Sequence, residues 1–226
     1  MTSRRRLPPD GALPPRHWGL ASEVAAGVIV VVALAGILLT GSSHSQEFAF
    51  LQAVSRVHVL ALDWLALAIN WLFGPPIATV VTVVTALLVL WRTRSLRRSL
   101  RFLTLIVLPW VGADLLKILV RRPRPEVTEL AHHLVGAPAS FSYPSGHTSF
   151  AASLGLAIVV LVWRHRLRRL AIIGAAIVAV ATAASRVYLG VHYPTDVVAA
   201  LLYTTAAVVI VDSLWRRLTT GRPRWR

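Results

Sequence analysis

Apolar runs separated by short polar stretches make up most of this chain. Seven apolar segments are recognisable, at residues 20–40, 57–73, 76–91, 102–120, 148–163, 170–188 and 196–215. Most of them approach the ~20 residues with which an α-helix crosses a bilayer. The pattern predicts an all-α, polytopic membrane protein with a single domain and no internal repeat. The first segment is too long for a signal-peptide core, so we expect it to be retained.

The second apolar segment departs from this pattern because Asp63 and Asn70 lie within it. An aspartate at the centre of a lipid-facing helix costs roughly 2.5–3.5 kcal/mol. We therefore predict that residues 44–74 form an extracytoplasmic amphipathic segment, with Trp64 and Trp71 at the membrane interface. Six membrane spans remain.

The distribution of basic residues predicts the orientation. The chain has 24 Lys+Arg against 9 Asp+Glu, a net charge of +15. In a soluble protein this excess would suggest a nucleic-acid partner, but here the arginines form short clusters between apolar runs, as on the cytoplasmic side of membrane proteins. With six spans, 18 of the 24 basic residues lie on the side of both termini. We expect a cell-membrane protein with cytoplasmic tails at 1–18 and 219–226, a six-span domain at 19–218, and no nucleic-acid partner.

Composition supports this class of protein. Hydrophobic residues make up 56% of the chain and charged residues 15%, which excludes a disordered chain. The chain has no cysteine, so a disulfide scaffold is excluded as well.

Three polar clusters lie at the predicted outer ends of the spans. The first runs from Lys117, the only lysine, to Arg124, and Asp114 lies one helical turn before the lysine. A buried lysine must find an anion or lose its charge. The alternative interpretation of this cluster is that the lysine side chain simply extends to the membrane surface beside the aspartate.

The second cluster, Tyr143-Pro-Ser-Gly-His-Thr148, opens the fourth span. Ser145 is a candidate N-cap, and the free N–H groups of a helix start attract anions. Gly146 lets a ligand approach the backbone closely. A capping turn with an interfacial His147 is the alternative.

The third cluster joins the fifth and sixth spans and contains Arg186, His192 and Asp196. An aspartate four residues after a histidine can accept its N–H and fix its tautomer, and an arginine is a bidentate phosphate donor. The alternative is a charged loop that connects two helices. Because the topology brings all three clusters to one side, their cations point to a bound phosphate. Two histidines beside a phosphate suggest a nucleophile and a general acid.

The motifs K-x6-R-P, P-S-G-H and S-R-x5-H-x3-D follow one another in this order between residues 117 and 196. In sequence and spacing they resemble the three signature motifs of the type 2 phosphatidic acid phosphatase family, which includes membrane lipid phosphatases and soluble vanadium haloperoxidases. The resemblance implies that His192 attacks phosphorus to form a phosphohistidine, that Asp196 orients it, and that His147 protonates the leaving oxygen and then activates water. It also implies a phosphate site without metal or other cofactor, made by Lys117, Arg124, Ser145, Gly146 and Arg186.

The expected substrate is a lipid phosphate or diphosphate drawn from the bilayer, of the undecaprenyl pyrophosphate, phosphatidic acid or phosphatidylglycerol phosphate class. Two alternatives stay open. The same phosphohistidine could pass its phosphate to an acceptor, as in a lipid phosphotransferase, or the charges could serve a non-catalytic transporter. Arg122 lies at the wrong spacing from Lys117 for the motif, so it is not assigned to the phosphate site, and helping to steer an anionic headgroup is the role left open for it. The loop residues Glu126, Glu129, His132 and His133 are expected to be solvated. Oligomeric state is not predicted.

Overall fold

The computed structural model describes residues 15–41, 45–136 and 138–220. Most of the two predicted tails lies outside these residues. The described chain is all-helical and contains no strand. Its α-helices are α1 (Pro15–Thr40), α2 (Ser45–Ser55), α3 (Leu60–Leu72), α4 (Pro75–Thr93), α5 (Leu96–Val120), α6 (Gly146–Leu161), α7 (Arg168–Tyr188) and α8 (Pro194–Thr220), with a short 3-10 turn at Val127–Glu129.

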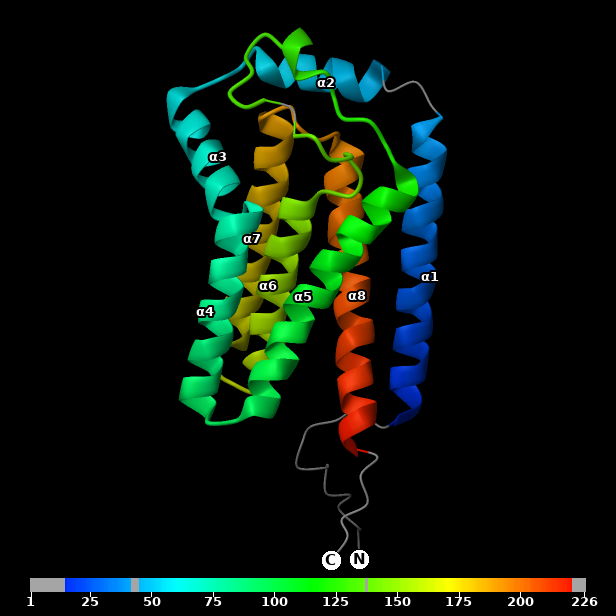
Figure 1. The fold of residues 1–226 in the computed structure, drawn as a ribbon, viewed down its shortest axis with the longest axis vertical. Helices are drawn as coiled ribbons and strands as arrows, with labels where there is room; N and C mark the ends of the chain where they lie inside the picture. The colour runs from blue at the N-terminus through cyan, green and yellow to red at the C-terminus, as the bar shows by residue number, and fades with distance from the viewer. Residues whose placement is uncertain (1–14, 42–44, 137, 221–226) are drawn as a thin grey trace, which may run out of the picture.

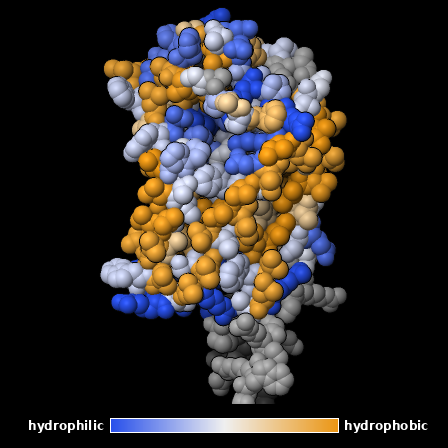
Figure 2. Space-filling model, in the orientation of Figure 1, coloured by the Kyte–Doolittle hydropathy of each residue, from blue (hydrophilic) through white to orange (hydrophobic). Residues whose placement is uncertain are grey.

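Most of the helices run lengthwise in one bundle, while α2 lies across one end of it (Figure 1). The α5–α6 loop lies at the α2 end. The start of α1, the end of α8 and the α4–α5 turn lie at the opposite end. Hydrophilic residues gather toward both ends of the molecule, with a mainly hydrophobic band between them (Figure 2). Among the described residues, α1, α4, α5, α7 and α8 are long and apolar enough to cross a membrane, as expected of a multi-pass membrane protein.

Two apolar helices are shorter, α3 with 13 residues and α6 with 16. At ~1.5 Å per residue, α6 measures roughly 24 Å, somewhat less than the hydrocarbon core of a bilayer. It is nevertheless an inner helix, because it packs against α5, α7 and α8. Gly155 allows its close contact with α7: a Cβ at this position would lie 2.8 Å from the Cβ of Ala175.

The segment predicted as one amphipathic element is two helices. Whereas α2 lies across the bundle end, α3 runs obliquely beside it and leads directly into α4 (Figure 1). The two polar residues of α3 make hydrogen bonds with α7. Asp63 accepts a 2.5 Å hydrogen bond from the Tyr188 hydroxyl, and Asn70 accepts one of 2.7 Å from Arg186. Asp63 thus has a partner within the protein, which reduces the cost on which the prediction for residues 44–74 rested.

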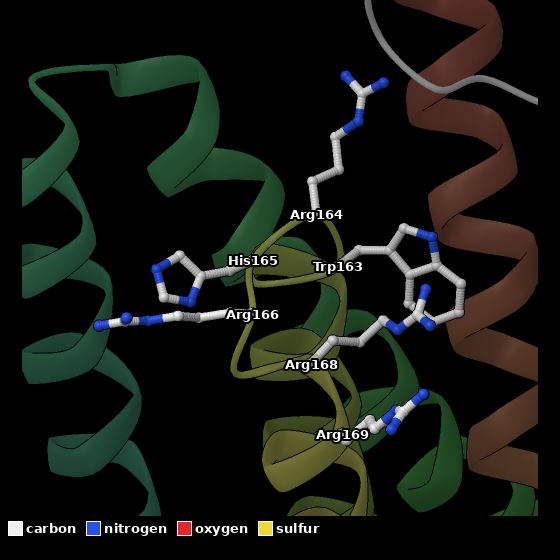
Figure 3. A pocket seen from close by; sticks show the side chains of 6 residues that line it. All are labelled: Trp163, Arg164, His165, Arg166, Arg168 and Arg169. Carbon is white, nitrogen blue, oxygen red and sulfur yellow. The ribbon is translucent and has the colours of Figure 1, made fainter.

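The turns at the end opposite α2 carry many of the arginines. The predicted 92–101 loop is almost entirely helical, since only Arg94 and Ser95 separate α4 from α5. Arg94 has a left-handed conformation that ends α4, and the Ser95 hydroxyl caps α5. Figure 3 shows the turn between α6 and α7, where four more arginines project around Trp163 and His165.

Candidate active site

The three polar clusters meet at the α2 end of the bundle, around a cavity of about 160 Å³. Its wall is formed by the ends of α5 and α7, the start of α6, the α5–α6 and α7–α8 loops, and the junction of α3 and α4. Six of the eight predicted site residues line it: Lys117, Arg124, Gly146, His147, Arg186 and His192. The other two, Ser145 and Asp196, are fully buried and are not among the lining residues.

His192 lies on the short connection between α7 and α8, with only 2% of its surface exposed. Its Nδ1 lies 3.3 Å from the Asp196 carboxylate, and its Nε2 lies 3.1 Å from Arg124 Nη1. Because an ionised carboxylate can only accept, Nδ1 carries the proton and Nε2 keeps its lone pair. Burial lowers the pKa of His192 to about 4, although Asp196 acts in the opposite direction. The imidazole is therefore neutral at pH 7, as a nucleophile must be.

The Asp196 carboxylate is held by several donors besides His192. Its Oδ2 accepts hydrogen bonds from the Ser142 hydroxyl and from the backbone N–H of Tyr193 (2.8 Å). Its Oδ1 lies 2.5 Å from Arg122 Nη1. These contacts fix the carboxylate so that one oxygen faces the histidine.

Arg124 and Arg186 bring guanidinium groups to the cavity without a carboxylate partner among the described residues. Arg124 donates to the carbonyls of Ser140 and Val191, both at 2.7 Å. Burial lowers its pKa to about 10, so it stays charged at pH 7. Arg186 is 2% exposed and donates through Nη1 to Asn70, but its buried Nε and Nη2 have no hydrogen-bond partner in the described chain. Buried donors of this kind are rare unless a ligand or water completes them.

Lys117 is the third cation of the wall. Its Nζ lies 2.9 Å from Asp114 on the preceding helical turn, and its side chain is 11% exposed. Gly146 packs directly on this ammonium group, since a Cβ there would lie 2.8 Å from Nζ. The glycine thus lets the start of α6 and its free N–H groups come close to the lysine.

The motif that opens α6 supplies a cap and a histidine. The Ser145 hydroxyl accepts a hydrogen bond from the Thr148 N–H (3.5 Å), so Ser145 is the N-cap of α6. His147 lies on the cavity wall and its Nε2 is 3.2 Å from the backbone oxygen of Asn70, at the end of α3.

Three residues at the site were not predicted to be part of it: Arg122, Ser142 and Asn70. Arg122 was set aside on spacing, yet its side chain is fully buried and ion-paired with Asp196. Asn70 appeared only as a polar residue out of place in an apolar segment, which was the available signal. Ser142 carried none, because only the fold brings the loop before α6 against the start of α8.

The cavity brings cationic side chains together with a neutral imidazole. Two arginines, a lysine and the N-terminus of α6 line the same cavity as His192, and Asp114 is the only carboxylate among the described residues that line it. Among the described residues, no group of three or more His, Asp or Glu side chains is placed to hold a metal ion. An anion in this cavity would meet the charges of Lys117, Arg124 and Arg186.

Comparisons with known proteins give relatives of one kind. The chain is 42% identical over 78 residues to phosphatidylglycerophosphatase B of Escherichia coli, covering 34% of this chain and 30% of the relative. It is 30% identical over 105 residues to an undecaprenyl-diphosphatase of Bacillus subtilis, covering 46% and 49% of the two chains. The matched segments thus span less than half the length of these curated relatives.

A solved structure shares the fold. The crystal structure of a transmembrane PAP2 type phosphatidylglycerolphosphate phosphatase from Bacillus subtilis superposes with a TM-score of 0.71 at 23% identity, over 91% of this chain and 98% of that one. The model of the PAP2 superfamily matches residues 98–219, more than half of the chain, and this range includes all three motifs. The chain therefore belongs to the PAP2 superfamily.

Proposed function

We propose that this protein is a membrane lipid phosphatase that hydrolyses a lipid phosphate or diphosphate through a phosphohistidine on His192. The observation that carries the proposal is Arg186. Its buried guanidinium faces the same cavity as His192 and keeps two nitrogens without a partner in the described chain. A phosphoryl group bound there would complete these donors and balance the charges of Lys117 and Arg124.

In the first step, the lone pair of His192 Nε2 attacks phosphorus and the bond from phosphorus to the lipid oxygen breaks. Asp196 stabilises the positive charge that develops on the imidazole. The three cations stabilise the charge on the equatorial phosphoryl oxygens, a role that Mg²⁺ has in other phosphoryl-transfer enzymes. His147 protonates the departing lipid oxygen.

In the second step, water attacks the phosphohistidine. His147, now neutral, takes a proton from the water while the nitrogen–phosphorus bond breaks and inorganic phosphate forms. This step separates the proposal from the lipid phosphotransferase alternative, in which an acceptor hydroxyl replaces the water.

We further propose six membrane crossings, made by α1, by α3 and α4 in succession, and by α5, α6, α7 and α8. An even number of crossings puts the start of α1 and the end of α8 on the same side of the membrane. This agrees with Figure 1, in which both lie at the same end of the bundle. The basic turns 92–101 and 162–168 would then be cytoplasmic and the cavity extracytoplasmic, as the positive-inside rule favours.

The names of the relatives set the range of substrates to test. They comprise a phosphatidylglycerophosphatase, an undecaprenyl-diphosphatase and, in Mycolicibacterium smegmatis, a decaprenylphosphoryl-5-phosphoribose phosphatase. A cavity lined by three cationic side chains at one end of an apolar bundle suits such molecules, because the phosphate can enter it while the tail stays in lipid.

Rapid-quench labelling of the purified protein with radiolabelled p-nitrophenyl phosphate tests the mechanism. The wild type should form an acid-labile, base-stable phosphoenzyme and release phosphate with EDTA present. His147→Ala should accumulate label, because this substrate needs little protonation to leave but hydrolysis of the intermediate is slowed. His192→Ala should form no label, and His133→Ala, which changes an exposed histidine of the α5–α6 loop, should behave as wild type. Label on the His192 variant, or a requirement for added Mg²⁺, would overturn the proposal.

A further inference from the structure

Arg122 connects the proposed catalytic centre to α2. Its side chain is fully buried, and its two terminal nitrogens each contact a carboxylate: Nη1 lies 2.5 Å from Asp196 Oδ1 and Nη2 lies 2.5 Å from Glu47 Oε2. Glu47 belongs to the first turn of α2, 75 residues earlier in the chain. Arg122 lies just after the end of α5, so three elements meet at one guanidinium.

Glu47 also caps the helix that carries Asp196. Its Oε1 accepts hydrogen bonds from the backbone N–H of Thr195 (3.0 Å) and from the Thr195 hydroxyl (2.8 Å). Thr195 is in the first turn of α8, where backbone N–H groups have no partner within the helix and a negative charge is favourable. Arg122 Nη1 donates to the same hydroxyl at 2.7 Å. One carboxylate of α2 therefore holds both the start of α8 and the arginine that contacts Asp196.

These contacts determine which oxygen of Asp196 meets the histidine. Arg122 occupies Oδ1, which leaves Oδ2 for Ser142, the Tyr193 N–H and His192 Nδ1. Arg122 is not among the residues that line the cavity, so it has no direct route to a bound phosphate. Its contact with the proposed catalytic residues is through Asp196.

We propose that Arg122 and Glu47 are positioning residues, which hold Asp196 so that it keeps the proton on His192 Nδ1 and leaves Nε2 free to attack. The inference rests on the proposed function for its kinetic effect, whereas the effect on the histidine tautomer does not depend on catalysis. A buried arginine paired with two carboxylates also contributes to folding. The test must therefore separate positioning from stability.

Arg122→Lys keeps the charge but cannot reach both carboxylates with a planar fork. Glu47→Gln is the milder change, because its amide oxygen can still accept from Thr195 while the charge toward Arg122 is lost. Arg121→Gln and Glu129→Gln are matched controls, since both residues are exposed. With p-nitrophenyl phosphate, each test variant should lower kcat by about tenfold to a hundredfold, as the loss of a positioning contact does. KM and inhibition by vanadate should change less than twofold, and the controls should match wild type.

Histidine nitrogen NMR of the detergent-solubilised protein gives a second readout. In the wild type His192 should appear as the Nδ1–H tautomer, and in Glu47→Gln or Arg122→Lys this signal should shift toward a mixture of tautomers. A lowered melting temperature with unchanged kcat and unchanged tautomer would mean that the network is only structural, and would overturn the inference. A rise in KM with kcat preserved would do so as well, because it would assign Arg122 to phosphate binding. An inactive wild type whose His192 tautomer still responds to Glu47→Gln would refute the phosphatase and leave the positioning role standing.

Discussion

Replacing Gly146 with alanine gives a sharp test of the anion site, because the change adds one methyl group at a known place. The new Cβ would lie 2.8 Å from Lys117 Nζ and 3.7 Å from Asp114 Oδ1. The first distance is too short for a stable contact, and Nζ is the far end of a flexible side chain. We therefore expect the ammonium group to move away while the backbone stays in place.

The magnitude follows from what the lysine loses. If Lys117 can no longer reach the phosphoryl group, one hydrogen bond from a charged donor is lost, which is worth about 1.5–3 kcal/mol. Vanadate inhibition should weaken by roughly 10- to 150-fold. The helix itself should not suffer, since alanine in place of glycine stabilises a helix by up to ~1 kcal/mol. A weaker site in a protein that is no less stable would separate this effect from misfolding.

Inhibition by vanadate and thermal unfolding should be measured on Gly146→Ala and on Gly136→Ala, where a Cβ would meet nothing within 4 Å. The control should match wild type in both. The effect of Gly146→Ala should also disappear when Lys117 is already alanine, because the atom that it displaces is gone. Equal vanadate inhibition in Gly146→Ala and Gly136→Ala would refute the assignment of Lys117 to the anion site.

Three further predictions concern topology, protonation and packing. The chain has no native cysteine, so single cysteines can be introduced in place of Ala139 and of Arg97. When intact cells are treated with an impermeant thiol reagent, the cysteine at 139 should be labelled and the one at 97 should be protected. The reverse pattern would place the cavity on the cytoplasmic side. Because burial lowers the pKa of His192 to about 4, its imidazole should remain neutral as the pH falls from 7 to about 5 in a histidine NMR titration, and a midpoint near the ordinary ~6.5 would contradict this. Gly155→Ala should destabilise the protein by about 1–3 kcal/mol because the new Cβ clashes with Ala175. In the control Gly174→Ala the new Cβ would have no atom within 4 Å, so the melting temperature should stay unchanged.

The sequence was sufficient for what depends on local pattern. The apolar segments correspond to the long helices within a few residues, because a hydrophobic run near the width of a bilayer has few alternatives to a helix. The short spacing of His192 and Asp196 across a helix start brought them into contact as expected. The order and spacing of motifs are properties of the sequence, so the family could be assigned from the sequence alone. The match to the PAP2 superfamily confirms that assignment.

The sequence was insufficient where a polar residue finds its partner far away in the chain. Asp63 was judged too costly for a lipid-facing helix, but Tyr188, 125 residues later in the chain, donates a hydrogen bond to it. Arg122 was judged by its distance from Lys117, although its side chain is paired with Glu47 and Asp196. In each case the free energy of burying a charge depends on a tertiary contact that spacing alone does not reveal.

The arginines of the site show how a structure separates ligand binding from scaffolding where a motif cannot. Arg122 and Arg124 are two residues apart and both are largely or fully buried, so composition does not distinguish them. Arg122 faces two carboxylates, and its positive charge is balanced within the protein. The partners found for Arg124 and Arg186 in the described chain are carbonyl oxygens, a hydroxyl, an imidazole nitrogen and an amide, all of them neutral. A buried cation surrounded by neutral groups remains costly until an anion arrives. That unbalanced charge, rather than the number of arginines, is the physical reason to expect a phosphate in this cavity.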